Sequence, residues 1–302
     1  MYASLITVAA LWGVATGLLL PRAAYRLSVE PEDAWRAGCP AGHPITGPAR
    51  GWLGRAGCPS CEVTVPSRTA TSPGSDAPVP DASATGVPEP PPGPLSPPVP
   101  LPPPGPVASA PVVVPPATRS VRYAPSFLVP PLTGLACAAL AAATGPRPEL
   151  AVWLLLAPFA VLLALVDRNV RRLPDQLTLP LAAGAPVLLG LAALLPGDGG
   201  TWTTALLGGL ALGACYFILF VINPNGMGFG DVKLALSLGV ALGWYGWLVL
   251  FVGAFAGFLL GSLYGLGLML LRRAGRGTAI PFGPFMIAGA LLGILLGALA
   301  AA

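Results

Sequence analysis

The chain has 302 residues, of which 54% are hydrophobic and only 9% are charged, and its mean hydropathy is +0.74. Soluble globular domains carry about 25% charged residues, so this composition excludes that class and predicts a polytopic membrane protein. The net charge of +4 could suggest an anionic partner, but the positions of the basic residues explain it better, and we expect no nucleic-acid partner.

Apolar runs long enough to cross a hydrocarbon core of about 30 Å recur along the chain. With a short run behind Lys233 and a last run that opens with prolines, they predict an all-α fold of about eight transmembrane helices in a lipid bilayer. The first run has no basic residue before it, which favours a retained helix over a cleaved signal peptide. The runs are 2–20, 126–143, 149–166, 177–195, 202–222, 232–244, 246–271 and 280–302.

The basic residues are distributed unevenly between the two sides of the predicted membrane. Fifteen of the sixteen Lys and Arg fall in segments 21–125, 167–176, 223–233 and 272–279, and only Arg147 falls outside them. Because short loops rich in Lys and Arg stay inside, these four alternate segments are predicted to be cytoplasmic, with both termini outside.

The first cytoplasmic segment divides into two parts of different composition. Residues 21–63 hold three of the five cysteines, whereas residues 64–125 contain runs such as "PEPPPGPLSPPVPLPPPGP". Such a stretch has too few large apolar residues to fold, so it predicts a disordered linker, either a spacer or a recognition tail for proline-binding modules. We therefore expect four parts: a first transmembrane helix (1–20), an insertion (21–63), the linker (64–125) and a membrane domain (126–302).

Three acidic residues lie at the predicted cytoplasmic ends of spans: Asp167, Asp175 and Asp231. Ionisable groups near membrane depth are costly, so they are candidates for function. Asp167 directly follows the apolar run of its helix. Asp175 follows Pro174 and opens the next span, so helix capping is its simplest interpretation.

Asp231 ends the glycine-rich stretch "NGMGFGD", in which Gly226, Gly228 and Gly230 precede it. Glycine permits positive φ and close approach of another chain, and irregular backbone at membrane depth occurs only when buried in protein or lining a water-filled cavity. This predicts a loop that admits water or an extended peptide beside the carboxylate; an ordinary cytoplasmic turn is the alternative. Lys233 would either favour the ionised form of Asp231 or extend its ammonium group to the interface.

Two carboxylates at facing helix ends can share one proton, so that one acts as a base towards water while the other donates to a carbonyl oxygen. Asp167 and Asp231 are the candidates for this aspartyl hydrolysis, which requires no cofactor. A carboxylate-dependent transporter would also hold acids at membrane depth, usually near the midplane of related halves, and no such internal symmetry is visible. A purely structural membrane scaffold would need neither the acid pair nor the glycines.

Three motifs resemble those of the type IV prepilin peptidases, which are Gly-x-Gly-Asp intramembrane aspartyl proteases. "GFGD" is similar to the Gly-x-Gly-Asp signature, "VDRNVRRLPDQLTLPL" is similar to the segment around the first catalytic aspartate, and "IPFGPF" is similar to a motif of the last span. The resemblance covers roughly residues 126–302. By residue-by-residue matching it implies that Asp167 and Asp231 are the catalytic pair.

The resemblance also implies residues that shape the loop and the substrate site, namely Gly228, Gly230, Lys233, Pro281 and Gly283. It implies a multi-pass enzyme of the bacterial plasma membrane that cleaves prepilin or pseudopilin-like proteins on the cytoplasmic side. A related Gly-x-Gly-Asp protease with another membrane substrate is the closest alternative.

The insertion contains a possible set of metal ligands, Cys39, His43, Cys58 and Cys61. Cytoplasmic thiols stay reduced, so a structural zinc site is favoured over disulfides, with three unconnected thiols as the alternative. Many prepilin peptidases carry four cysteines in this position, whereas here Gly42 replaces the second one and a histidine follows it. S-adenosylmethionine is expected as a cosubstrate only if this chain retains the N-methylation that many family members perform.

Overall fold

The computed structural model describes residues 2–30, 33–58, 60–61, 121–122, 127–224, 226–271 and 280–301. Helices dominate these residues, which confirms the predicted all-α membrane class. The predicted proline-rich linker lies outside the described residues, apart from 121–122.

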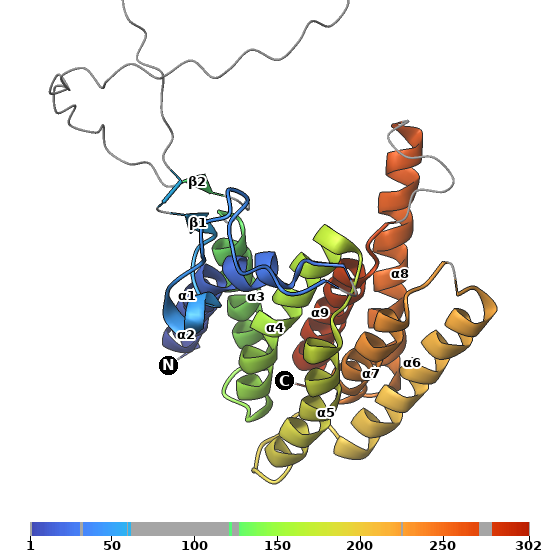
Figure 1. Cartoon of the computed structure of the whole chain (residues 1–302). Coiled ribbons are helices and arrows are strands. Elements are labelled where there is room, and N and C mark those ends of the chain that lie inside the picture. The colour runs from blue at the N-terminus through green and yellow to red at the C-terminus, as the bar shows by residue number, and fades with distance from the viewer. Residues whose placement is uncertain are drawn as a thin grey trace, which may run out of the picture. The chain divides into compact units, whose positions relative to one another are not determined.

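Eight of the described helices have 15 residues or more (Figure 1), and six of them are long and apolar enough to cross a membrane. α3 and α7 are shorter. The eight helices are α1 (Tyr2–Leu27), α3 (Val129–Thr144), α4 (Glu149–Val170), α5 (Asp175–Ala192), α6 (Trp202–Ile222), α7 (Phe229–Gly243), α8 (Trp247–Leu270) and α9 (Gly283–Ala300). The insertion adds a left-handed turn labelled α2 (Pro48–Gly51) and strand β1 (Gly57–Cys58), which pairs antiparallel with β2 (Val121–Arg122).

α1 runs seven residues beyond the predicted end at residue 20 and contains Pro21. Proline has no N–H and normally interrupts a helix. Here the backbone of Gly54 takes up the disturbed hydrogen bonds, because its N–H donates to the carbonyl oxygen of Leu19 and its carbonyl oxygen accepts from Arg22 N, both at 3.1 Å. The insertion is thereby bonded directly into α1.

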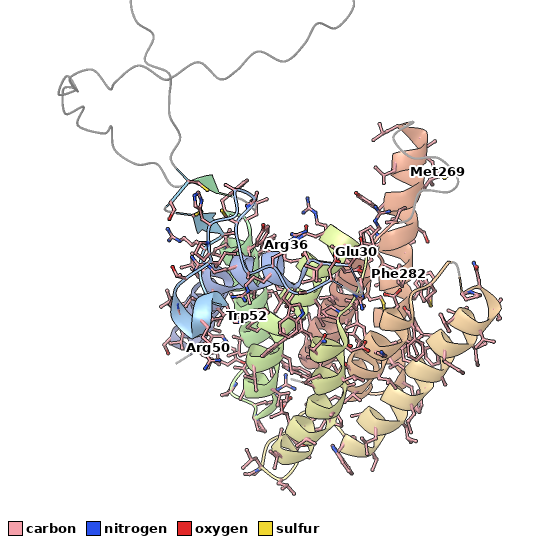
Figure 2. All side chains as sticks on the ribbon, in the orientation of Figure 1. Glu30, Arg36, Arg50, Trp52, Met269 and Phe282 are labelled. Atoms are coloured by element: carbon pink, nitrogen blue, oxygen red, sulfur yellow. The ribbon has the colours of Figure 1, made fainter. Side chains whose placement is uncertain are left out.

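Side chains reinforce the contact between the insertion and α1. The guanidinium of Arg22 donates to the carbonyl oxygen of Thr46 at 2.7 Å, and that of Arg26 lies 4.2 Å from the ring centre of Trp52. Figure 2 labels Arg50, which belongs to the turn α2, and Trp52, which directly follows it.

The helices pack in two groups that share α5 and α9. α1 packs on α3 and α4, whereas α6 packs on α7, and α8 packs on α9. α6 and α7 approach closely through glycines: a Cβ on Gly239 would lie 2.5 Å from the carbonyl oxygen of Gly208. Small residues at such contacts are typical of helix association in lipid, where apolar surface alone gives no drive.

Candidate active site

A cleft of about 460 Å³ opens where α4 ends and where α7 and α9 begin. We call it the aspartate cleft. It brings together all but one of the catalytic and loop-shaping residues predicted from the sequence, and Gly283, the exception, donates a hydrogen bond to one of them. Figure 2 labels Phe282, another of its lining residues. The predicted residues that line it are Asp167, Gly228, Gly230, Asp231, Lys233 and Pro281.

Asp167 lies in the last turn of α4, and only 4% of its surface is exposed. Its Oδ2 accepts a hydrogen bond of 2.9 Å from the backbone N–H of Gly283, the first residue of α9. The amides and the dipole at a helix N-terminus both favour an anion in this place. A Cβ on Gly283 would lie 2.9 Å from the same oxygen, so glycine permits the approach.

Asp231 was predicted to end an irregular loop, and this is wrong, because α7 already begins at Phe229. Asp231 is the third residue of the helix, is 8% exposed, and accepts a hydrogen bond of 3.2 Å from Gly228 N on its Oδ2. The carboxylate thus caps its own helix and satisfies an amide that has no partner within the helix.

The glycines before Asp231 do not serve positive φ, since neither Gly228 nor Gly230 has one. Gly230 serves close approach, because a Cβ there would lie 2.9 Å from the Cβ of Leu173, in the connection that follows α4. A Cβ on Gly228 would make only an ordinary contact of 3.5 Å with Asp231 Oδ2. Gly230 therefore lets the two aspartate-bearing segments meet, whereas Gly228 has room for a side chain.

The two carboxylates line the same cleft. Each uses Oδ2 for a main-chain amide, and neither Oδ1 has a hydrogen-bond partner among the described residues. Both carboxylates line the cleft, and each is held through one oxygen while the other has no hydrogen-bond partner among the described residues.

The predicted capping role of Asp175 is wrong. The N-cap of α5 is Pro174, without a side-chain cap, and the carboxylate of Asp175 forms an ion pair of 2.6 Å with Lys233 instead. The Lys233 ammonium also lies 4.9 Å from the ring centre of Phe229. Among the described residues, the ion pair of Lys233 is therefore with the exposed Asp175 and not with Asp231.

Aromatic residues that the sequence analysis did not single out pack against Phe282, which lines the cleft. Tyr216 of α6 is buried against Phe258 and Phe282, with ring centres 5.5 and 6.3 Å apart. Phe282 directly precedes the glycine that donates to Asp167. The position of Phe282 inside "IPFGPF" could have identified it as a site residue. Tyr216 had no comparable sequence signal, apart from its hydroxyl group within an apolar run.

The four predicted metal ligands meet in the insertion, with donor atoms of Cys39, His43, Cys58 and Cys61 within 4.8 Å of one another. The distances from His43 Nδ1 to the three sulfurs are 3.4–3.8 Å, and Cys39 Sγ lies 3.5 Å from Cys61 Sγ. Tetrahedral ligands at bond lengths of about 2.0–2.3 Å would be about 3.5–3.8 Å apart, so this set fits a metal ion.

The turn from Cys39 to His43 explains how histidine can replace a cysteine here. Gly42 has a φ of +83° and donates to the carbonyl oxygen of Cys39, so the chain reverses one residue before His43. Desolvation raises the pKa of Cys39, but hydrogen bonds from the Ala41 backbone and from Cys61 outweigh it and lower that pKa to about 6. Desolvation and the neighbouring Cys39 raise the pKa of Cys61 to about 12. At neutral pH the cluster thus presents at least one thiolate to a cation.

Comparison with known proteins agrees with these features. Residues 154–266 match the model of the Type IV leader peptidase family. Proteins named prepilin leader peptidase/N-methyltransferase are similar to the chain. The one from Aeromonas salmonicida (strain A449) is 35% identical over 182 residues, which are 60% of this chain and 60% of that protein. The one from Bacillus subtilis (strain 168) is 30% identical over 176 residues, which are 57% of this chain and 67% of that protein.

The chain spans about 60% of the length of the first of these relatives. No solved structure matches it. The six long apolar helices and the bacterial relatives identify a multi-pass protein of the bacterial inner membrane. From its motifs, its paired aspartates and these similarities, the chain belongs to the Type IV leader peptidase family.

Proposed function

We propose that this protein is an aspartyl endopeptidase that removes the leader from type IV prepilin-like proteins. The observation that carries the proposal is the pair of buried carboxylates in one cleft, each held by a main-chain amide through one oxygen. The printed names of the relatives supply the substrate class. Membership of a peptidase family favours hydrolysis over transport.

Hydrolysis at such a pair needs only the two side chains and water. The ionised carboxylate takes a proton from water as the water oxygen attacks the scissile carbonyl carbon, and the protonated partner donates to the carbonyl oxygen. Collapse of the tetrahedral intermediate breaks the C–N bond, and the proton taken from water passes to the leaving amine. The carboxyl product returns the other proton to the carboxylate that donated it, which restores the pair. Asp167 and Asp231 are the proposed pair.

We place this reaction at the cytoplasmic face, because Arg171 and Arg172 line the same cleft and belong to the basic segments that remain inside. A reporter fused after residue 170 should therefore read cytoplasmic. An exterior reading would contradict the placement.

The direct test is incubation of the purified protein with candidate prepilins, followed by mass analysis of the mature amino terminus. We expect a product that lacks the leader, and the same spectrum reports any methyl group added to the new terminus. The Aeromonas salmonicida relative is the positive control. If that relative cleaves and this protein leaves every prepilin intact, the proposal is wrong.

We further propose that the Cys/His cluster holds a structural zinc ion, supported by the four soft or borderline donors at tetrahedral spacing. Purified protein should contain about one zinc per chain, and Cys58→Ser with Cys61→Ser should remove it. Cys215→Ser, at an exposed cysteine outside the cluster, is the matched control and should keep the metal. Elemental analysis that finds no zinc in the wild-type protein would exclude the site.

A further inference from the structure

A second polar cluster lies at the opposite ends of the helices that carry the aspartates. We call it the Glu149 cluster. Glu149, the first residue of α4, has no exposed surface, and its Oε1 accepts from the Tyr245 hydroxyl at 3.4 Å and from Gly199 N at 3.2 Å. Trp153 Nε1 donates to the same hydroxyl at 3.2 Å. The cluster consists of Thr144, Arg147, Glu149, Trp153 and Tyr245.

The Glu149 cluster explains the one exception in the charge pattern of the sequence. Arg147 lies outside the basic segments, and its Nε is 3.7 Å from Glu149 Oε1. Its guanidinium also donates to the carbonyl oxygens of Thr144 and Ala298, the latter in α9. This arginine is therefore neutralised by a buried partner.

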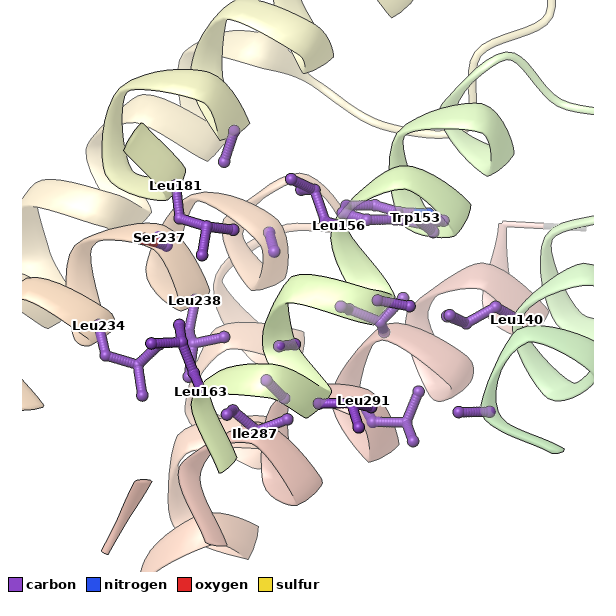
Figure 3. Close-up of a pocket in the computed structure, with 18 residues that line it drawn as sticks. Leu140, Trp153, Leu156, Leu163, Leu181, Leu234, Ser237, Leu238, Ile287 and Leu291 are labelled. Atoms are coloured by element: carbon purple, nitrogen blue, oxygen red, sulfur yellow. The ribbon is translucent and has the colours of Figure 1, made fainter. Parts of the chain in front are cut away.

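The cluster joins two helices that make little direct contact with each other and that both pack on α5 and α9. α4 contacts α1, α3, α5 and α9, and α7 contacts α5, α6, α8 and α9, without extended contact between α4 and α7 in the part of the chain described. An apolar cavity of about 120 Å³ lies between them. Figure 3 shows Leu163 of α4 and Leu234 of α7 lining it.

The hydrogen bonds of Tyr245 with Glu149 and Trp153 connect the start of α4 with the second residue after the end of α7. Burial and the Glu149 carboxylate raise the pKa of Tyr245 to about 12, so its hydroxyl stays a neutral donor. The other ends of the same two helices carry Asp167 and Asp231.

The geometry makes the aspartates sensitive to this connection. About 27 Å of helix separates Glu149 from Asp167, at 1.5 Å per residue, so a tilt of about 5° at the cluster would move Asp167 by about 2 Å. A misplacement of about 1 Å at reacting groups can reduce a rate about 10²-fold. The cavity takes the place of direct packing between α4 and α7, so their contacts with the neighbouring helices, α5 and α9 among them, are what oppose such a tilt.

We infer that Glu149 and Tyr245 are positioning residues that set the separation of Asp167 and Asp231 from the far ends of α4 and α7. The inference rests on the proposed peptidase function. Burial of a carboxylate is costly, and an apolar contact would join the two helices at lower cost. The fixed geometry of the hydrogen bonds is therefore the advantage that this cluster has over an apolar contact.

Tyr245→Phe tests the inference with the loss of one hydroxyl. We expect kcat for leader cleavage to fall about tenfold or more, with KM and the amount of folded protein in the membrane unchanged, because the cleft itself is untouched. Trp202→Phe is the matched control: it removes a bond of 2.9 Å to the Pro186 carbonyl oxygen, which joins α6 to α5 at the same end, and should leave kcat unchanged.

Two variants at position 149 provide the rescue comparison. Glu149→Gln keeps an oxygen acceptor for the Tyr245 hydroxyl and should retain more of kcat than Glu149→Leu, which should resemble Tyr245→Phe. A wild-type kcat in Tyr245→Phe, or an equal fall in Trp202→Phe, would overturn the inference. Failure of the wild-type protein to cleave would instead refute the proposed function, so the two failures are distinguishable.

Discussion

Asp167→Asn and Asp231→Asn should each abolish leader cleavage, with a loss of at least about 10²–10⁴-fold, the range attributed to general acid–base catalysis. Asparagine keeps an oxygen that can accept from Gly283 N or Gly228 N, so each side chain should stay in place. An amide can neither take a proton from water nor share one with the partner carboxylate. The rate of leader loss, measured by mass analysis on equal amounts of inserted protein, checks the prediction.

Asp175→Asn is the matched comparison for these two variants. Its carboxylate also lines the cleft, but it is exposed and paired with Lys233, and exposed ion pairs contribute about 0–1 kcal/mol. We expect a loss of no more than a few fold. An inactive Asp175→Asn beside an active Asp167→Asn would mean that the wrong carboxylate has been paired with Asp231.

Gly230→Ala should reduce cleavage more than about tenfold, although the change adds a single methyl group. That methyl would lie 2.9 Å from the Cβ of Leu173, so the segment that follows α4 must shift away from α7. Overpacking of this kind typically costs about 1–3 kcal/mol and here moves one aspartate-bearing segment relative to the other. Cleavage rates on equal amounts of inserted protein give the measurement.

Gly228→Ala adds the same methyl group two residues earlier, where φ is −73° and the nearest atom would be 3.5 Å away. Its loss of activity should be at least tenfold smaller than that of Gly230→Ala. Equal losses in both variants would show that the segment requires glycine for a reason other than the contact with Leu173.

The sequence predicted the helical membrane class and the residues that gather in the aspartate cleft, because apolar runs and short motifs are local signals. Helix ends were harder to predict. The glycines before Asp231 suggested an irregular loop, yet Phe229 and Gly230 are helical, since the Asp231 side chain caps the helix start. Likewise, α1 continues past Pro21 because a distant residue, Gly54, takes over its backbone bonds.

The contacts that define the site join residues far apart in the chain, and a single sequence contains no signal for them. Asp167 is held by Gly283, 116 residues away, and Lys233 pairs with Asp175, 58 residues away. The capping role expected for Asp175 was reasonable from Pro174 alone, but its carboxylate pairs with Lys233 instead, a residue distant in the sequence. The catalytic roles of Asp167 and Asp231 stay predictions until the variants are measured.

Asp167 acts as a cap for a helix other than its own. In the first turn of α9, Pro284 has no N–H, and the backbone N–H groups of Phe285 and Met286 donate to the carbonyl oxygen of Phe282. The remaining N–H, that of Gly283, donates to Asp167. Loss of this acceptor would therefore weaken the fold as well as the chemistry. A descendant of this protein that no longer cleaved peptides would still be selected to keep aspartate or asparagine at 167. Because Asp231 also accepts from an amide at a helix start, aspartate or asparagine at either position is compatible with a fold that no longer cleaves peptides, and activity has to be measured rather than inferred from these positions.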